Sequence, residues 1–306
     1  MSAHRWRIGT RGSALALWQA HFVQRRLAEA DPSCVAEVEI IKTSGDLIQD
    51  RALLEVGGKG LFVKEIQTAL LEGAVDLAVH SLKDYPAENP QGLLLACVPE
   101  RQDRRDALVM PRGKSANELP ADAVVATGSL RRHHQAKLLF PRWKIAGLRG
   151  NVDTRLKKLD AGQCNAILLA SAGLRRLGYE SRIARLFEPQ EMVPAVGQGA
   201  IAIECRSNDK EAKAFLGRIE AKVARRETGA ERHFLRELGG NCTTPLGITA
   251  VIEGERAELY AFLASIKGER HMKDHIAGPA VKAEELASTL LKRFWEQGAA
   301  ELLEKE

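Results

Sequence analysis

The feature that most constrains the fold is an order of strand, Gly-Ser turn and helix that occurs twice. In "RIGTRGSALALWQAHFVQRRLAEA" a short strand leads through Gly12 to Ser13, a candidate N-cap, and apolar residues then recur at helical spacing until Asp31. The segment "AVVATGSLRRHHQAKLLF" repeats this order around Gly128 and Ser129, and a Gln-Ala pair follows each glycine after seven residues. The repetition predicts two similar α/β domains.

A second pair of similar segments follows in the same order. "LLEGAVDLAVHS" and "LDAGQCNAILLAS" each end a helix at a glycine, Gly73 or Gly162, and each open an apolar strand at Asp76 or Asn165. Chance similarity of strand and helix punctuation is the alternative explanation. Because strands alternate with helices, we expect mainly parallel sheets.

Charged, proline-containing and glycine-containing stretches mark the crossings between these domains. Residues 99–113 would carry the chain into the second domain, and "EMVPAVGQGAIAIECR" would return it. After residue 222 come a helix, a cysteine-containing turn, two strand-like segments and an amphipathic helix from about Glu284. The predicted parts are α/β domain 1 over residues 1–99 and 200–217, α/β domain 2 over 105–193, and a small α+β domain 3 over 222–306.

Composition limits the class of protein. No segment approaches the roughly 20 apolar residues that span a bilayer. The segment "MSAHRWRIGT" has neither the apolar core nor the small-residue cleavage site of a secretory leader, so we do not expect a secreted or membrane-bound protein. The five cysteines are scattered without C-x-x-C pairs, which argues against a disulfide framework or zinc site and favours a reducing cytoplasm. The net charge of +5 favours an anionic partner, but no nucleic-acid-binding module is recognisable.

Cationic residues gather where each Gly-Ser step opens a helix. Arg11 precedes the first step, and Arg131 and Arg132 lie in the first turn of the second helix, where the dipole disfavours cations and attracts anions. We therefore expect a ligand to supply negative charge. Three further arginines follow predicted strands, namely Arg149, Arg155 and Arg176. Each alone could be a solvated surface residue, but together they favour a ligand with several carboxylates or phosphates.

Two further runs carry candidate chemistry. In "HSLKDYP", Lys83 and Asp84 follow an apolar strand, at the end where ligands gather in open α/β sheets. Asp84 is a candidate for stabilising a cation or handling a proton, and a surface ion pair is the alternative. "EVGGKGLFVKE" predicts a mobile flap that would bring Lys59 and Phe62 over a site. A separate turn, "LGGNCTTPLG", presents Cys242 on a glycine-rich loop.

Seven motifs resemble those of the porphobilinogen deaminase (hydroxymethylbilane synthase) family and occur in the family's order. They are "GTRGSALAL", "GGKGLFVKE", "HSLKD", "TGSLRR", "LRGNVDTRLKKL", "VPAVGQGAIAIECR" and "ERHFLRELGGNCTTPLG", and they extend from about residue 8 to 247. The resemblance implies two domains like those of periplasmic binding proteins, joined by hinge crossings and facing each other across a cleft. A third domain would present the cysteine.

The resemblance also implies the activity and its residues. The enzyme would join four porphobilinogen molecules head to tail, releasing ammonia each time, to give hydroxymethylbilane for tetrapyrrole (haem and porphyrin) biosynthesis. A dipyrromethane cofactor attached to Cys242 by a thioether would prime the chain. Asp84 matches the catalytic aspartate, which would stabilise the cationic azafulvene left when ammonia departs. The residues expected to bind cofactor and substrate carboxylates are Arg11, Ser13, Lys83, Thr127, Ser129, Arg131, Arg132, Arg149, Arg155 and Arg176. A cytoplasmic monomer without metal, nucleic acid or membrane partner is expected.

Two positions depart from the family pattern. Asn241 stands before the cysteine, where Gly, Ser or Ala is usual, and leaves the loop geometry open. Tyr85 follows "HSLKD", where a smaller aliphatic residue is common, and we expect little effect. Three other functions compete: a non-catalytic anion-binding or effector-sensing module, a thiol hydrolase using Cys242 with His233 or His80, and a nucleic-acid-binding protein.

Overall fold

The computed structural model describes residues 5–44, 63–240 and 244–303. Lys59, Phe62, Asn241 and Cys242 lie outside the described residues. Within them, no helix is long and apolar enough to cross a membrane. Contacts divide the chain into unit 1, residues 1–102 with 200–225, and unit 2, residues 103–199 with 226–306.

Unit 1 is built on a five-stranded sheet in the order β2-β1-β3-β10-β4. Its strands are β1 (Arg5–Thr10), β2 (Val35–Ile40), β3 (Leu77–Ser81), β4 (Leu93–Cys97) and β10 (Ile201–Arg206). β1 runs parallel to β2 and β3, whereas β10 is antiparallel to both of its neighbours. The strand β10 follows the second α/β segment in the sequence and completes the first sheet.

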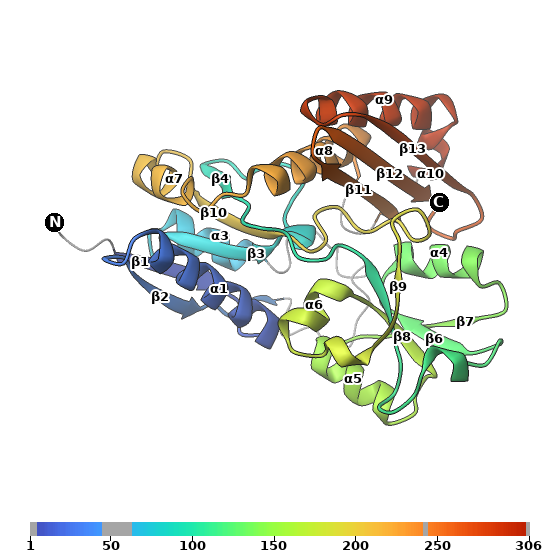
Figure 1. The fold of residues 1–306 in the computed structure, drawn as a ribbon. Helices are drawn as coiled ribbons and strands as arrows, with labels where there is room; N and C mark the ends of the chain where they lie inside the picture. The colour runs from blue at the N-terminus through green and yellow to red at the C-terminus, as the bar shows by residue number, and fades with distance from the viewer. Residues whose placement is uncertain (1–4, 45–62, 241–243, 304–306) are drawn as a thin grey trace. The chain divides into compact units, whose positions relative to one another are not determined.

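Helices cover both faces of this sheet (Figure 1). They are α1 (Ala14–Ala30), α3 (Lys64–Leu71) and α7 (Lys210–Leu216). Leu77 and Val79 of β3 pack with α1 and α7, while Ala78 packs with α3. This alternation follows from the two-residue repeat of a strand. Ser13 caps α1 by accepting a hydrogen bond from the Ala16 N–H at 3.3 Å, as its sequence predicts.

The first part of unit 2 repeats this design with the sheet order β7-β6-β8-β5-β9. Its strands are β5 (Asp106–Val109), β6 (Val124–Thr127), β7 (Lys144–Gly147), β8 (Ala166–Ala170) and β9 (Ile183–Phe187). Its helices are α4 (Leu130–Leu139), α5 (Val152–Asp160) and α6 (Ser171–Arg176), with short 3-10 turns η2 (Ala116–Glu118) and η3 (Glu180–Arg182). β6 is parallel to β7 and β8, and β5 is antiparallel to β8 and β9.

The rest of unit 2 is a three-stranded antiparallel sheet in the order β11-β12-β13, covered by helices on one face (Figure 1). Its elements are α8 (Lys222–Leu238), β11 (Leu246–Glu253), β12 (Arg256–Ala264), β13 (His271–Pro279), η4 (Ala280–Lys282), α9 (Ala283–Glu296) and α10 (Ala299–Leu303). The first four residues of α8, 222–225, fall in unit 1. In the core between this sheet and its helices, the rings of Phe234 in α8 and Phe294 in α9 pack edge to face with their centroids 5.6 Å apart.

The two α/β sheets agree in detail. Asp76 accepts a hydrogen bond from the Arg7 N–H at 3.0 Å, and its own N–H donates to the Arg7 carbonyl. Asn165 makes the same pair of bonds with Val124 at the start of the other sheet. Gly73 and Gly162, which precede them, have φ of 74° and 75°, a conformation that favours glycine. The predicted fold class, with two similar, mainly parallel α/β parts and a C-terminal α+β part, is confirmed.

Two details differ from the expectation. The charged stretch 99–113 contains the buried strand β5, whose first residue, Asp106, is fully buried among cations. β13 was not anticipated because its outward residues are polar and its sequence, "HMKDHIAGP", has few buried apolar side chains.

Candidate active site

The carboxyl edge of the unit 1 sheet gathers four of the predicted residues. Because β1 and β3 are parallel neighbours, the segments that follow them start at the same edge. Arg11 and Ser13 follow β1, whereas Lys83 and Asp84 lie in the 3-10 turn η1 (Leu82–Asp84) after β3. The edge thus combines cations with one carboxylate.

Asp84 is a half-buried acid on a fixed turn. The turn is anchored by Leu82, whose side chain is buried and whose N–H donates to the Ala200 carbonyl at 3.0 Å. At the preceding position, Gln19 of α1 donates from Nε2 to the Ser81 hydroxyl at 2.9 Å. No hydrogen bond or ion pair among the described residues engages the Asp84 carboxylate. Within this part of the chain, Asp84 is therefore available to a ligand.

A second carboxyl group, Glu204 of β10, lies fully buried behind this turn. It accepts a hydrogen bond from the Tyr85 hydroxyl at 2.8 Å and one from Gln67 Nε2 of α3 at 3.1 Å. His80 Nε2 lies 3.2 Å from its other oxygen. His80 is itself buried, so it is inaccessible as the base of a thiol hydrolase.

The carboxyl edge of the unit 2 sheet is formed by the ends of β6, β7 and β8. Thr127, Gly128 and Ser129 connect β6 to α4, and Ser129 caps that helix by accepting from the Arg132 N–H at 3.4 Å. A Cβ placed on Gly128 would lie 3.6 Å from an Arg149 Nη and 3.7 Å from an Arg155 Nη. Two guanidinium groups therefore converge beside a helix N-terminus.

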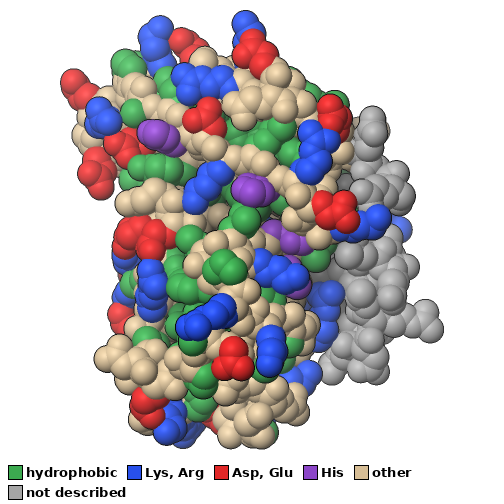
Figure 2. All heavy atoms as spheres, turned by 90° about the vertical axis from the view of Figure 1, so that its right-hand side faces the viewer, with side chains coloured by type: hydrophobic (Ala, Val, Ile, Leu, Met, Phe, Trp, Pro, Cys, Tyr) green, Lys and Arg blue, Asp and Glu red, His purple; other side chains and the backbone are tan. Residues whose placement is uncertain are grey.

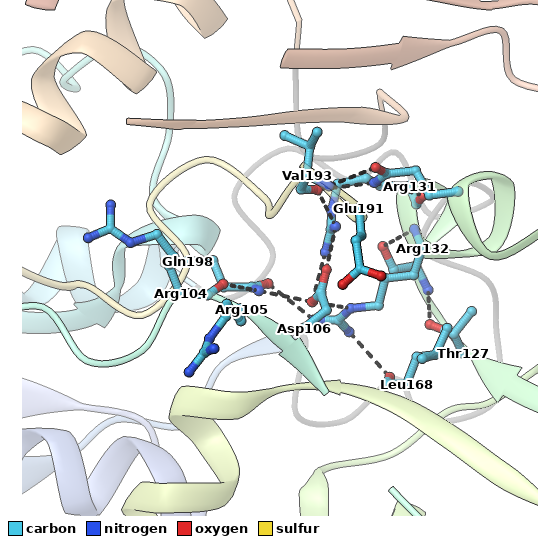
Figure 3. Close-up of polar contacts among 12 residues, drawn as sticks. Arg104, Arg105, Asp106, Thr127, Arg131, Arg132, Leu168, Glu191, Val193 and Gln198 are labelled. Atoms are coloured by element: carbon cyan, nitrogen blue, oxygen red, sulfur yellow. Dashed lines mark hydrogen bonds and ion pairs between the residues drawn. The ribbon is translucent and has the colours of Figure 1, made fainter. Parts of the chain in front are cut away.

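Arg131 and Arg132 are buried and bonded to an internal carboxylate (Figure 3). Arg131 Nη1 donates to Asp106 Oδ2 at 2.6 Å, and Arg132 Nε donates to Asp106 Oδ1 at 2.8 Å. Burial alone would raise the pKa of Asp106, but the two guanidinium groups hold it below its usual value. The negative charge that the sequence argument assigned to a ligand is thus supplied at these two positions by Asp106.

The same cluster connects the two crossing segments of unit 2 (Figure 3). Gln198 Nε2 donates to Asp106 at 2.9 Å and to the Arg104 carbonyl at 2.7 Å, while its Oε1 accepts from Arg132 at 3.1 Å. Arg131 also donates to the Val193 carbonyl at 2.6 Å. The arginines are held in place by these bonds before any ligand binds.

Arg176 lies at the end of α6 rather than beside Gly128. Its Nη2 donates to the Gly199 carbonyl at 2.7 Å, and burial lowers its pKa to about 10. Its side chain therefore remains cationic at neutral pH while it holds the return crossing.

The residues of the unit 2 edge fit an anionic pyrrole cofactor. The backbone around Gly128 leaves no room for a side chain at this position, because a Cβ there would lie 2.6 Å from the Leu148 carbonyl oxygen. Arg149 makes no hydrogen bond or ion pair through its side chain with other described residues, and the buried Nε–H of Arg131 has no partner among them. Cationic donors, a helix N-terminus and close backbone approach suit ligand carboxylates.

Four features were not predicted from the sequence: the positions of Asp106, Gln198 and Glu204 in the structure, and the hydrogen bond from Tyr85 to Glu204. A signal for the acids was present: Glu204 interrupts the apolar run "IAIECR", and Asp106 opens "DALV". A single acid in a buried strand requires internal partners. The partners could not be identified, because they come from distant segments.

The remaining alternatives find little support in the described residues. His233 Nε2 contacts the Ser288 hydroxyl at 2.7 Å, so the His233 side chain is directed at α9. On the face in Figure 2, Asp and Glu side chains are interspersed among the Lys and Arg side chains, most of all in the upper part of the view. Four cysteines are described, and all are buried free thiols: Cys34, Cys97, Cys164 and Cys205.

Two solved structures show low similarity to this chain. A probable amino-acid ABC transporter extracellular-binding protein from Bacillus subtilis is 9% identical, with a TM-score of 0.42 over 71% of this chain and 90% of that one. A YaeC-family lipoprotein from Enterococcus faecalis is 11% identical, with a TM-score of 0.41 over 72% and 93% of the two chains. These values are too low to carry an argument.

The sequence comparisons are decisive for the family. Residues 6–214 match the family described as porphobilinogen deaminase, dipyromethane cofactor binding domain, and residues 226–296 match porphobilinogen deaminase, C-terminal domain. The porphobilinogen deaminase of Syntrophus aciditrophicus is 43% identical over 298 residues, which are 97% of each chain. With matched domains over most of its length, the chain belongs to the porphobilinogen deaminase family.

Proposed function

We propose that this chain joins four porphobilinogen molecules head to tail into hydroxymethylbilane, releasing ammonia at each step. The observation that carries the proposal is the half-buried Asp84 carboxylate, which is unengaged among the described residues and lies at the edge that holds Lys83 and Arg11. Membership of the family supports the same activity.

The cations at both sheet edges would bind the substrate's acid groups. Each pyrrole ring carries an acetate and a propionate, so negative charge accumulates as the chain grows. Arg149 and Arg155 beside Gly128 are suited to these groups, because guanidinium forks bind carboxylates bidentately. Thr127 and Ser129 would add hydroxyl donors, and Arg11, Ser13 and Lys83 would act in the same way in unit 1.

Asp84 would act on the reacting centre. Loss of ammonia leaves an electron-poor carbon and a positive charge shared with the pyrrole nitrogen. A carboxylate beside that nitrogen stabilises the charge and can hold its proton. Positioned acid–base groups of this kind contribute about 10²–10⁴-fold in rate.

Cys242 would hold the dipyrromethane through a thioether, and the cofactor when bound supplies the primer for chain growth. Support comes from the other thiols: burial raises the pKa of Cys97 to about 12 and that of Cys205 to about 11. Thiols that are buried and protonated are poor nucleophiles and inaccessible to a precursor.

We also propose that the protein works as a monomer in the cytoplasm. The free thiols of the described cysteines are compatible with a reducing compartment. Light scattering after gel filtration should give a mass close to 33.6 kDa, and a stable dimer would contradict this part of the proposal.

Denaturing mass spectrometry with an activity assay tests the function. The purified chain should carry one dipyrromethane mass, which peptide mapping should place on Cys242 and which Cys242→Ser should abolish. Asp84→Asn should keep the adduct and lose turnover of porphobilinogen by about 10²-fold or more. An unmodified, inactive wild-type chain from a host that makes the precursor would contradict the function, and near-normal turnover of Asp84→Asn would contradict the role of Asp84.

A further inference from the structure

One buried carboxyl group fixes both sides of the turn that carries Asp84. His80, four residues before Asp84, lies 3.2 Å from Glu204 through its Nε2. Tyr85, the next residue after Asp84, donates its hydroxyl to Glu204 at 2.8 Å. The backbone on each side of Asp84 is therefore connected to the same group.

Glu204 is a fixed point within the sheet. It belongs to β10, where it pairs with Ala78 of β3, and no part of it is exposed. Gln67 of α3 donates to both of its oxygens, at 3.1 and 3.3 Å. A group held by a strand ladder and by a helix cannot move with the turn, so the turn is positioned relative to the sheet.

Of the residues whose side chains contact Glu204, Tyr85 is the one next to Asp84 in the sequence. Its side chain is 3% exposed and packs with Leu82, Leu95 and Val98 beneath the turn. A phenol has one proton, and the 2.8 Å bond to Glu204 is shorter than the 3.3 Å contact with Asn89. Packing places the ring, and the hydroxyl bond fixes its depth against Glu204.

We propose that Tyr85, acting through Glu204, is a positioning residue for Asp84. The bond sets the height of the 3-10 turn above the sheet edge, and with it the place of the Asp84 carboxylate. The inference rests on the proposed role of Asp84 in the reaction. Since a misplacement of about 1 Å can cost on the order of 10²-fold in rate, one hydrogen bond beneath the turn has a measurable effect.

Tyr85→Phe is the direct test because it removes the hydroxyl and keeps the ring. We expect kcat for porphobilinogen to fall about tenfold, on the order expected for a small displacement of a reacting group. The KM should change less than twofold, because the cations that bind substrate carboxylates are untouched. The dipyrromethane content by mass spectrometry should stay at one per chain.

A double-mutant cycle separates positioning from a general loss of stability. Asp84→Glu retains a carboxylate but displaces it by one methylene, so precise placement of the turn is already lost. Tyr85→Phe should then lower kcat less than twofold in the Asp84→Glu background. An equal tenfold fall in both backgrounds would show a merely structural role and overturn the proposal.

Tyr179→Phe is the matched control. It removes a 2.7 Å hydrogen bond from a tyrosine hydroxyl to Asp153 in unit 2, remote in sequence from η1. Its kcat should equal that of the wild type. If Tyr85→Phe fails to fold, Glu204→Met, which offers no carboxylate oxygen to the Tyr85 hydroxyl, replaces it in the same cycle, with the same expected coupling to Asp84→Glu.

The outcomes also separate this inference from the proposed function. Near-normal turnover of Asp84→Asn removes the role of Asp84 itself. If Asp84→Asn is inactive while Tyr85→Phe keeps full kcat, only the positioning role of Tyr85 is overturned.

Discussion

Asp106 and Glu204 are two fully buried acids on the antiparallel strands of similar sheets, yet their partners differ in kind. Asp106 contacts the guanidinium groups of Arg131 and Arg132. Glu204 contacts His80, Tyr85 and Gln67. Asp106 neutralises part of the permanent charge of the two guanidinium groups, whereas Glu204 accepts hydrogen bonds from uncharged donors.

The register of the sheets explains the difference. Asp106 pairs with Ala170 at the last position of β8, so it lies at the ligand edge beside the first turn of α4. In unit 1 the corresponding partner of Ser81 is Ile201, and Glu204 lies three residues further inside. An acid at the edge can orient binding cations, and an acid inside the sheet can fix the turn above it. Duplicated architecture thus supports two separate tasks.

Asp106→Asn should give the largest loss of stability. Removing one partner of a buried pair leaves two guanidinium groups without a counter-charge, at a cost of about 3–5 kcal/mol in the free energy of unfolding. Denaturant unfolding followed by circular dichroism at pH 7 measures it. A loss no greater than that of Glu204→Gln would contradict the distinction drawn between the acids.

The lowered pKa of Asp106 predicts how its contribution to the free energy of unfolding changes with pH. Its folded pKa is lowered, so near pH 4 the unfolded chain binds more protons and stability rises with pH. The stabilisation is present above the unfolded pKa of about 3.9 and is lost as the pH falls below it. The difference between wild type and Asp106→Asn should therefore narrow in unfolding measured below pH 4.

Gly128→Ala and Gly12→Ala compare the two Gly-Ser turns. A Cβ at Gly128 would lie 2.6 Å from the backbone oxygen of Leu148, whereas one at Gly12 would meet, among the described residues, only Ile40 Cγ2, at 3.3 Å. We expect Gly128→Ala to lose about 1–3 kcal/mol and Gly12→Ala to lose less. Thermal unfolding of both variants measures the contrast, and equal shifts would contradict it.

Glu204→Gln should cost about 1–2 kcal/mol, less than Asp106→Asn, because hydrogen-bond donors rather than guanidinium charges surround it. The amide can still accept from Tyr85 but must direct its NH₂ towards another donor. The same denaturant series measures this loss. A loss above that of Asp106→Asn would reverse the comparison.

His134 and Trp18 occupy equivalent positions in the two α/β segments, five residues after the N-cap serine of the helix. The difference between them is expected to have the smallest effect on stability. Trp18 stacks on Phe22 at 5.5 Å, whereas His134 Nε2 contacts the Ile266 carbonyl at 3.1 Å. Burial lowers the pKa of His134, and the bond to Ile266 opposes this. The unfolded chain then takes up the proton first, so stability should fall as the pH drops below 6.5. Proton NMR should give a His134 titration midpoint below 6.5, and one above it would reverse the sign.

The features that depend on residue periodicity and on turn or capping residues could be predicted from the sequence. The two strand–turn–helix repeats, the caps at Ser13 and Ser129, and the edge positions of Asp84 and Arg149 follow from local pattern. The partners of Asp106 and Glu204 did not, because each pairing joins segments far apart in the chain. The pairing of Glu204 with Tyr85 spans 119 residues, and no local propensity reports such a contact.

The bonds between Asp76 and Arg7 fix the start of β3 against β1, at the edge opposite Asp84. β3 has five residues, which at about 3.3 Å each span roughly 16 Å before the 3-10 turn begins. Inserting or deleting one residue in that span would turn every later side chain to the other face of the sheet. The length of β3 therefore fixes the distance between Asp84 and the hydrogen bonds that join Asp76 to Arg7 at the other end of the strand.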